Sequence, residues 1–223
     1  MIDLKNKLKA LYTQKEQIED EIKSLELQIQ EATFNNKQKQ VKTTFSKDEK
    51  IDIFKSLFIA RNDVYAKKWV SKDGNKQGFY PVTRTFRGED YIPLTNKEIE
   101  SHLRGLIHLA TYCINNENSS KFIAFEILDE DKFKLQIALN ALNIRAYYEL
   151  NSYNSLIVWL FLEEEISSKI VFNFAQFILK KANIHGKVFP NQEFATRASL
   201  GNNIELPLHL KHREKNKTVF IDA

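Results

Sequence analysis

The order of apolar segments from Lys121 onward constrains the fold of this chain more than any other feature. Lys121–Leu128 is apolar on both faces, as is typical of a central strand that is covered on each side. The apolar periods that follow predict a helix at 132–143 and a hairpin of two strands at 144–150 and 155–162. They then predict a longer helix at 166–182 and a final strand from about Gly186. This order is that of a split ferredoxin-like or RRM-like βαββαβ sheet. We therefore expect an α+β domain with both helices on one sheet face, the other face being covered or functional.

Helical spacing also predicts which side of each helix packs against the sheet. In the first helix the residues expected on the buried face are Phe133, Ile137, Ala138, Ala141 and Leu142. In the second they are Ile166, Ile170, Phe174, Phe177 and Ile178. The carboxylates at 129–131 could gather a divalent cation, although such a run is more often the solvated start of a helix.

The first half of the globular region contains two helix starts and one stretch with strand character. Two capping boxes, each a Ser or Thr followed three residues later by Glu, predict helices that begin at Ser46 and Thr95. Polar and apolar residues alternate in Arg61–Trp69 enough to predict a strand, and 71–78 is predicted to be a polar, glycine-containing turn. Basic and aromatic side chains interleave here, which suits a nucleic-acid strand but is also common where the rings belong to the core.

The first 34 residues carry a heptad pattern. Apolar residues alternate steps of three and four, with Lys15 as the single polar interruption: Leu4, Leu8, Leu11, Ile18, Ile22, Leu25, Ile29 and Ala32. About four heptads without Gly or Pro favour a coiled coil over an isolated amphipathic helix. Lysines dominate the first half and acidic residues the second, so an antiparallel homo-oligomer sets unlike charges opposite each other. We predict a coiled-coil helix at 1–34, a polar linker at 35–47 and a globular domain at 48–223.

Composition limits the cellular setting. Hydrophobic residues make up 43% of the 223 residues, which is sufficient for a core, and the net charge of +4 permits a phosphate-bearing partner without demanding one. The single cysteine, Cys113, excludes an internal disulfide and a cysteine-based zinc site, and it suits a reducing compartment. Since no apolar stretch approaches the length of a membrane span, we expect a cytoplasmic protein without a membrane partner.

Several segments, matching in order, carry a family resemblance. They are Leu57-Phe58 with Arg61–Trp69, Ile92–Thr95 with His102-Leu103, Val188–Gln192, Leu200–Leu208 and Val219–Asp222. Together they cover most of residues 50 to 223 and resemble the archaeo-eukaryotic primase superfamily, in particular the primase-like domains of TOTE conflict systems. The resemblance implies a ferredoxin-like catalytic sheet and a defence or mobile-element setting, and a leading coiled coil is common in such proteins.

The sequence departs from the family at the positions that the resemblance marks as catalytic. Two aspartates one residue apart would occupy Glu126 and Leu128, the histidine of a Ser-x-His would occupy Ile157 after Ser155, and a third acid would occupy Gly186. Two-metal nucleotidyl transfer needs several carboxylates around both cations, and one glutamate cannot supply them. We therefore expect no catalytic residues and no cofactor, with Glu126 only a weak candidate for Mg²⁺ or Mn²⁺.

No other metal site is expected from the sequence. The cysteine cluster that the family usually carries between Tyr80 and Ile92 is missing, so its zinc is expected to be absent too. Three further histidines, His185, His209 and His212, are spread too widely in the sequence to predict a set of metal ligands.

The leading hypothesis is a catalytically degenerate primase-like domain that binds nucleic acid (single-stranded DNA or RNA) or a nucleotide and oligomerises through its N-terminal coil. The residues expected to form a basic groove are Arg61, Lys67, Lys68, Trp69, Lys187, Arg197, Asn202, Asn203, Lys211 and Arg213. The alternative for these residues is that they are ordinary solvated cations around a core tryptophan. Two other functions stay open, a residual primase-polymerase that uses Mg²⁺ or Mn²⁺ and a protein-interaction subunit.

Overall fold

The computed structural model describes residues 45–85, 88–196 and 199–221 together with scattered positions before Phe45. The chain divides into two units, Met1–Phe45 and Ser46–Ala223. In the first unit the described positions are all helical except Phe45: Lys7, Leu11, Tyr12, Gln14, Lys15, Gln17, Ile18, Glu21 and Leu25. The rest of the predicted coiled coil and nearly all of the predicted linker lie outside the described residues, so those boundaries stay a prediction.

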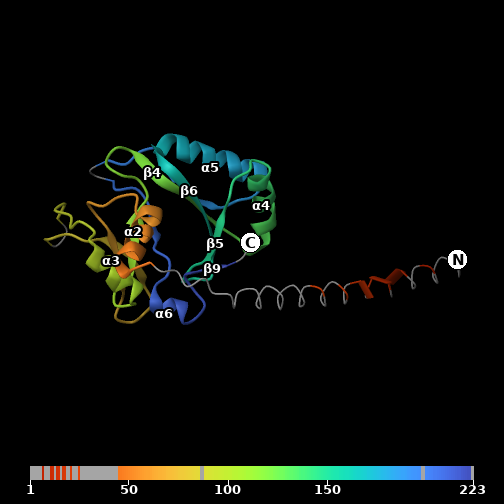
Figure 1. Ribbon diagram of the computed structural model, residues 1–223, viewed down its shortest axis with the longest axis horizontal. Helices are drawn as coiled ribbons and strands as arrows, with labels where there is room; N and C mark the ends of the chain where they lie inside the picture. Colours follow the sequence, from red (N-terminus) through yellow and green to blue (C-terminus); the bar gives the residue numbers. More distant parts are fainter. Residues whose placement is uncertain are drawn as a thin grey trace. The chain divides into compact units, whose positions relative to one another are not determined.

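The main sheet of the second unit has the predicted order of elements. Its elements are β4 (Ser119–Ile127), α4 (Lys132–Asn140), β5 (Tyr147–Leu150), β6 (Leu156–Ser167), α5 (Ser168–Ala182), β7 (Lys187–Phe189) and β9 (Val219–Ile221). The strands lie in the order β7-β4-β6-β5-β9, and each pairs antiparallel with its neighbours (Figure 1). The first four of these strands reproduce the split βαββαβ arrangement, and β9 adds a strand beside β5.

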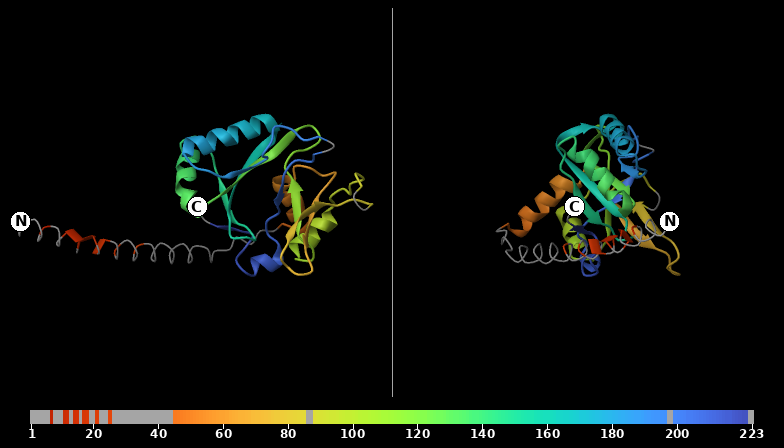
Figure 2. Two further views of the ribbon diagram at one scale, coloured as in Figure 1. Left: turned by 180° about the vertical axis from the view of Figure 1, so that it is seen from behind. Right: turned by 90° about the vertical axis from the view of Figure 1, so that its right-hand side faces the viewer.

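Helices α4 and α5 cover one face of this sheet (Figures 1 and 2). Residues from the sheet and both helices form one core there, including Ile123, Phe125, Leu135, Leu139, Val171, Ala175 and Ile178. The predicted helix faces are partly wrong, because Phe133 and Ile137 on α4 are each 69% exposed and Ile170 and Phe177 on α5 are 61% and 50% exposed. Each helix carries more apolar residues than one buried stripe can use, so spacing alone cannot select the stripe that faces the sheet.

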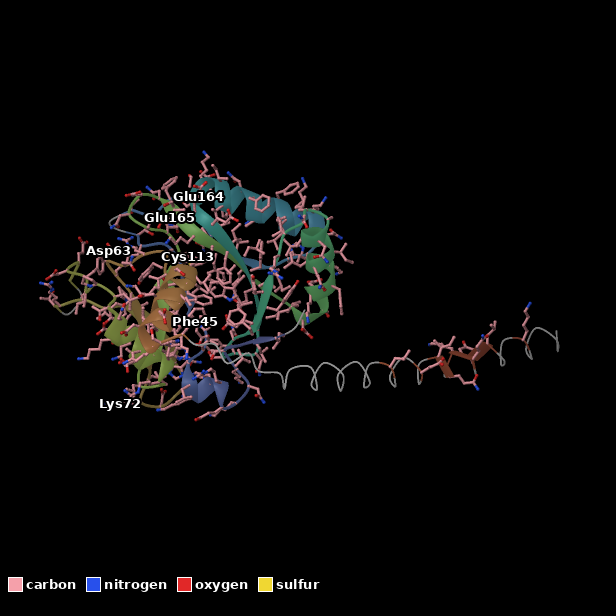
Figure 3. All side chains as sticks on the ribbon, in the orientation of Figure 1. Phe45, Asp63, Lys72, Cys113, Glu164 and Glu165 are labelled. Atoms are coloured by element: carbon pink, nitrogen blue, oxygen red, sulfur yellow. The ribbon has the colours of Figure 1, made fainter. Side chains whose placement is uncertain are left out.

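The opposite face of the sheet is covered by α2 (Lys47–Phe58) and by a second core. The predicted capping box is confirmed, since the Ser46 and Glu49 side chains each accept a hydrogen bond from the other residue's backbone N–H. Phe58 and Phe122 both pack edge-on against Trp159, with ring centroids 5.2 and 5.1 Å apart. Cys113 belongs to the same core (Figure 3), where burial raises the pKa of its thiol.

A second, smaller sheet lies beside this core. It is built from β1 (Ala66–Val70), β2 (Gln77–Pro81), β3 (Leu109–Tyr112) and β8 (Asn203–Glu205), in the order β2-β1-β3-β8. The helices associated with it are α3 (Asn96–Leu103), whose predicted capping box at Thr95 is confirmed, and the short α6 (Leu210–Arg213). The sequence did not predict β3 or β8, and the strand predicted from Arg61 begins only at Ala66.

The acidic run after β4 forms a single 3-10 turn, η1 (Asp129–Asp131), that leads into α4. Asp129 and Glu130 are exposed, whereas Asp131 is buried and binds Lys134 at 2.7 Å. The interpretation of this run as a helix start is therefore confirmed. Within the described part of the chain, no helix combines the length and apolar character needed to cross a membrane.

Candidate functional site

Glu126 lies near the end of β4 in a row of side chains that crosses four strands. Its register partners are Lys187 on β7 and Ile157 on β6, and Ile157 is paired in turn with Glu149 on β5. Residues paired directly across strands point to the same face of a sheet, so these four side chains share one face. Lys187 Nζ lies 2.9 Å from Glu126 Oε2, so the carboxylate of Glu126 is already paired with a cation.

This row borders a cavity of about 270 Å³, to which both sheets contribute. Its lining residues are Phe79, Glu126, Asn151, Tyr153, Ile157, Lys187, Phe189, Asn203, Ile204 and Glu205. The volume is near the lower end of small-molecule pockets. Aromatic rings, an amide and charged groups of both signs surround the space, a combination that can hold a small polar ligand with a flat apolar part.

The other residues at the catalytic positions that the resemblance implies are exposed, part of a turn or closely packed against β4. Leu128 is 63% exposed just beyond β4. Ser155 donates its backbone N–H to Asn151 Oδ1 in the turn between β5 and β6. A Cβ atom at Gly186 would lie 2.9 Å from Ile127 Cγ2 and 3.0 Å from the backbone oxygen of Glu126. There is thus no room for a side chain at 186, and Lys187 is the β7 residue that faces Glu126.

The family described as "TOTE conflict system, Archaeo-Eukaryotic Primase domain" matches residues 49–223. The chain belongs to this family. The resemblance predicted from short segments of sequence is therefore confirmed, and the match begins within the first turn of α2. Among curated proteins no relative matches the chain. A solved structure described as the polymerase domain from Mycobacterium tuberculosis ligase D in complex with DNA is similar over 73% of this chain and 75% of that chain, at 13% identity and a TM-score of 0.38.

Glu149 is a buried carboxyl group of the primase domain that sequence reasoning missed. Its side chain is 1% exposed and accepts a hydrogen bond of 2.7 Å from Trp159 Nε1. Burial raises the pKa of Glu149 to about 8, and the nearby carboxylate of Glu205 acts in the same direction. The signal in the sequence was a single glutamate inside an apolar strand, which alternation assigns equally well to a solvated face.

The residues on β1 and just before it do not form the predicted basic groove as one surface. Arg61 is 8% exposed and bound to Asp63 at 2.7 and 2.9 Å, where it lines a different cavity of about 510 Å³. Lys67 and Lys68 are neighbours in a strand, so they point to opposite faces of the sheet. Trp69 is 42% exposed, so it is not a core tryptophan.

Only part of the predicted set gathers at the Glu126 cavity. Lys187 and Asn203 line it, and Lys68 Nζ lies 4.7 Å from the centre of the Tyr153 ring, which lines it too. Asn202 is held by the backbone, since its side chain accepts from the Asn191 N–H and donates to the Val188 carbonyl. The remaining predicted residues are elsewhere or not described: Lys211 and Arg213 are exposed on α6, and Arg197 lies outside the described residues.

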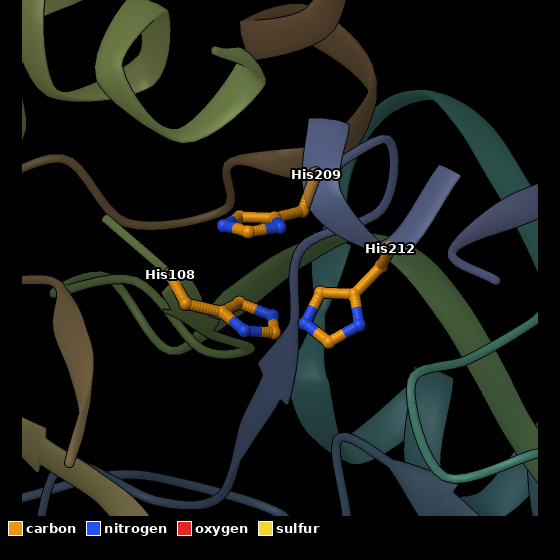
Figure 4. Close-up of side chains that lie close together, drawn as sticks. All are labelled: His108, His209 and His212. Carbon is orange, nitrogen blue, oxygen red and sulfur yellow. The ribbon is translucent and has the colours of Figure 1, made fainter. Parts of the chain in front are cut away.

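Three histidines that are far apart in the sequence lie together in the fold. His209 and His212, at the start and within α6, meet His108 just before β3, and one ligand atom of each lies within 4.8 Å of the others (Figure 4). The prediction that the histidines are too widely spread is therefore wrong for His209 and His212. The third histidine of that prediction, His185, is exposed and lines another cavity with Gly186. Burial lowers the pKa of His209 to about 4.

A fourth histidine, His102, is packed beside this cluster but has a structural role. Its Nε2 lies 2.9 Å from the carbonyl oxygen of Pro207, and its Nδ1 accepts the backbone N–H of Leu109 at 3.2 Å. These two contacts define a neutral ring with the proton on Nε2. Burial lowers the pKa of His102 to about 3, which keeps the ring neutral.

Proposed function

We propose that this primase domain has lost nucleotidyl transfer and binds a nucleotide, free or within a single strand, in the cavity beside Glu126. The observation that carries the proposal is the lysine opposite that carboxylate. Lys187 lies on one side of Glu126 and forms an ion pair with its carboxylate, and Ile157 lies on the other side. Neither neighbour supplies a second carboxylate that could bind a metal ion together with Glu126. Two-metal catalysis requires carboxylates that hold two divalent ions about 3.5 to 4 Å apart.

The chemistry around the cavity supports binding of a nucleotide. The ammonium groups of Lys68 and Lys187 offer charge to a phosphate, and the rings of Phe79 and Tyr153 offer surfaces for a base. The Asn203 amide can both donate to and accept from a base edge. The volume of about 270 Å³ favours a single nucleotide unit over a longer stretch of strand.

The experiment measures the affinity of the full chain for a labelled single-stranded oligonucleotide at several salt concentrations. Lys68→Ala should weaken binding and reduce the slope of log affinity against log salt by about 0.7, the value for one phosphate contact on a single strand. Lys67→Ala is the matched control, because the same charge is removed from the other face of β1. An equal effect in both variants, or wild-type binding weaker than roughly 0.1 mM at low salt, would contradict binding at this cavity.

Loss of catalysis is tested separately. We expect no template-dependent incorporation of labelled nucleotide with either Mg²⁺ or Mn²⁺, because Glu126 lacks a second carboxylate opposite it. Incorporation that disappears in Glu126→Gln would establish the alternative, a residual primase-polymerase.

Assembly through the N-terminal helix completes the proposal. The described seam residues Leu11, Ile18 and Leu25 are spaced by seven and are 54%, 48% and 53% exposed. An apolar stripe of this kind is typical of a helix that packs on a partner helix, and the charge segregation favours an antiparallel second copy. Such a pair would present two primase domains in the cytoplasm within a conflict system.

A second candidate function, a protein-interaction subunit, is favoured by the exposed apolar residues of the helical layer. Phe133 and Ile137 on α4, and Ile170 and Phe177 on α5, are each at least half exposed. A photo-reactive residue at Ile137 should then cross-link one protein in an extract of the native cells, whereas the same residue at exposed Lys72 should not. Equal cross-linking at both positions would exclude a specific contact at this layer.

A further inference from the structure

His108, His209 and His212 form a compact group with its own geometry, separate from the row that contains Glu126. Their ring centroids are 4.5 Å apart for His108 and His209, and 4.8 Å apart for each of the two pairs that include His212 (Figure 4). Two of the rings come from α6 and its first cap position, and the third comes from the residue before β3. The fold thus joins two distant segments of the chain through three imidazoles.

The distances suit a transition-metal ion. Zinc bound tetrahedrally by imidazole nitrogens at about 2.0 to 2.1 Å requires these nitrogens to lie about 3.3 Å apart. The ligand atoms here all lie within 4.8 Å of one another, and a side-chain rotation that unstacks the rings of His108 and His209 would let their nitrogens converge on one ion. Imidazole ligands suit Zn²⁺, Cu²⁺ or Ni²⁺, whereas Mg²⁺ and Ca²⁺ prefer oxygen ligands.

An orphaned nitrogen is the second, independent observation. His209 is 5% exposed, and its Nδ1 has no hydrogen-bond partner among the described residues. Buried polar atoms in proteins are nearly always paired, so an unpaired nitrogen on a ring that contacts two other imidazoles supports a missing ligand. The contrast with His102 is informative, because both of its ring nitrogens are occupied by backbone groups.

Glu205 on β8 orients one of the three rings. Its Oε1 lies 2.5 Å from His108 Nε2, with both side chains almost fully buried, and its other oxygen accepts the Ser152 hydroxyl at 2.9 Å. A carboxylate that binds one nitrogen of a histidine fixes the orientation of the ring. The contact holds the His108 ring beside His209 and His212, which makes Glu205 a positioning residue.

We propose that His108, His209 and His212 bind one zinc-type divalent ion, with the fourth tetrahedral position left to water or an exogenous oxygen ligand. The ion ties α6 to the start of β3. Because Glu205 also lines the Glu126 cavity, the ion lies beside that cavity, but its binding does not depend on a nucleotide. No cysteine takes part in this site, since the single cysteine of the chain, Cys113, is not one of the three ligands.

The test uses the full chain, stripped of metal with a chelator and then titrated with Co²⁺ and with Zn²⁺ alone. We expect one ion per chain, the strong visible absorption of tetrahedral Co²⁺, its displacement by Zn²⁺, and a Kd for Zn²⁺ tighter than about 1 μM. His212→Asn should weaken Zn²⁺ binding at least about 100-fold, and Glu205→Gln about 10 to 100-fold. Because His212 is only partly buried, its variant is expected to fold even where a change at buried His209 does not.

His185→Asn is the matched control, since it removes an exposed imidazole that lies outside the cluster, and it should bind Zn²⁺ like the wild type. Glu126→Gln should also bind Zn²⁺ unchanged, which separates this ion from any at the nucleotide cavity. Wild-type binding weaker than roughly 0.1 mM, or an affinity that is the same in His212→Asn and the wild type, would overturn the proposal. Neither result would bear on nucleotide binding, which is measured by the oligonucleotide titration.

Discussion

Glu149→Gln should become more stable than the wild-type protein as the pH rises from about 6.5 to about 8. The reason is the burial of the Glu149 carboxyl group, whose folded-state pKa of about 8 is far above its ordinary value of 4.5. A group whose pKa is raised on folding binds protons more tightly in the folded state. Its contribution to stability is therefore complete at low pH and is lost as the pH rises toward the folded pKa.

The magnitude follows from the two pKa values. At about pH 6.5 the protonated form of folded Glu149 exceeds the ionised form roughly thirtyfold, and at about pH 8 the two are equal, whereas the unfolded chain is ionised throughout. The contribution of Glu149 to the free energy of unfolding should fall by roughly 1 to 2 kcal/mol across this interval. The carboxylate of Glu205, whose pKa is lowered by its bond to His108, is ionised in both states here and does not contribute.

The interval is chosen to reduce the effect of the buried histidines, and the comparison with Glu149→Gln removes what remains. His102 and His209 have pKa values lowered to about 3 and about 4, so the unfolded chain binds more protons than the folded chain below about pH 6.5. Their effect on stability has the opposite sign to that of Glu149, and it would mask the effect at lower pH. Between about pH 6.5 and about pH 8 the unfolded rings lose their remaining half proton, which raises stability by roughly 0.4 kcal/mol per histidine. His212, whose pKa burial also lowers, acts in the same direction, and the effect of all three rings is the same in the wild type and in Glu149→Gln.

The assay is urea unfolding followed by tryptophan fluorescence, at one protein concentration and with chelator present. Glutamine keeps the oxygen that accepts from Trp159 Nε1 but cannot ionise, so Glu149→Gln should match the wild type near pH 6.5 and exceed it near pH 8 by roughly 1 to 2 kcal/mol. Glu130→Gln, at an exposed position, is the control. A stability difference between Glu149→Gln and the wild type that does not grow between about pH 6.5 and about pH 8 would refute the buried, protonated carboxyl group.

Three further predictions follow from the packing and the charges. Gly186→Ala should lower the free energy of unfolding by about 1 to 3 kcal/mol in urea titrations, because the new Cβ meets Ile127 and the backbone of β4; an unchanged midpoint would contradict this. Lys187→Glu should create Mn²⁺ binding detectable by calorimetry, since it sets a second carboxylate opposite Glu126, whereas Lys187→Gln should not. Ile18→Lys should convert an oligomer into a monomer in sedimentation at micromolar concentration; a wild-type monomer would show that the N-terminal helix does not associate.

Much of the fold could be predicted because its signals are local. The alternation of buried strands and amphipathic helices after Lys121 reproduces the order of the main sheet, and both capping boxes mark real helix starts. The missed strands β3 and β8 are short, and each owes its place to pairing with distant segments. The strand propensity of the four residues of β3 or the three residues of β8 carries too little information to identify such strands.

The candidate site was harder to predict because it depends on register. Successive residues in a strand point to opposite faces, so the sequence alone was sufficient to separate Lys67 from Lys68. The prediction of one groove that contains both lysines overlooked this. The position of Lys187 opposite Glu126 required the pairing of β7 with β4, which no local pattern contains. The histidine cluster is a stronger case, because the spacing of His209 and His212 suggests one helix turn but gives no information about His108.

Register also bears on the proposed loss of catalysis, because it determines the charge of the row of side chains that contains Glu126. Carboxylates that converge on one place repel each other unless cations offset their charge, so an active site of this kind is stable only with its metals or with shifted pKa values. In this chain the corresponding row is a lysine, a glutamate, an isoleucine and a glutamate whose pKa of about 8 leaves it mostly protonated at neutral pH. The row is close to neutral without any ion. Such a row needs no bound cation to offset its charge, which supports our proposal that catalysis was lost while the fold was retained.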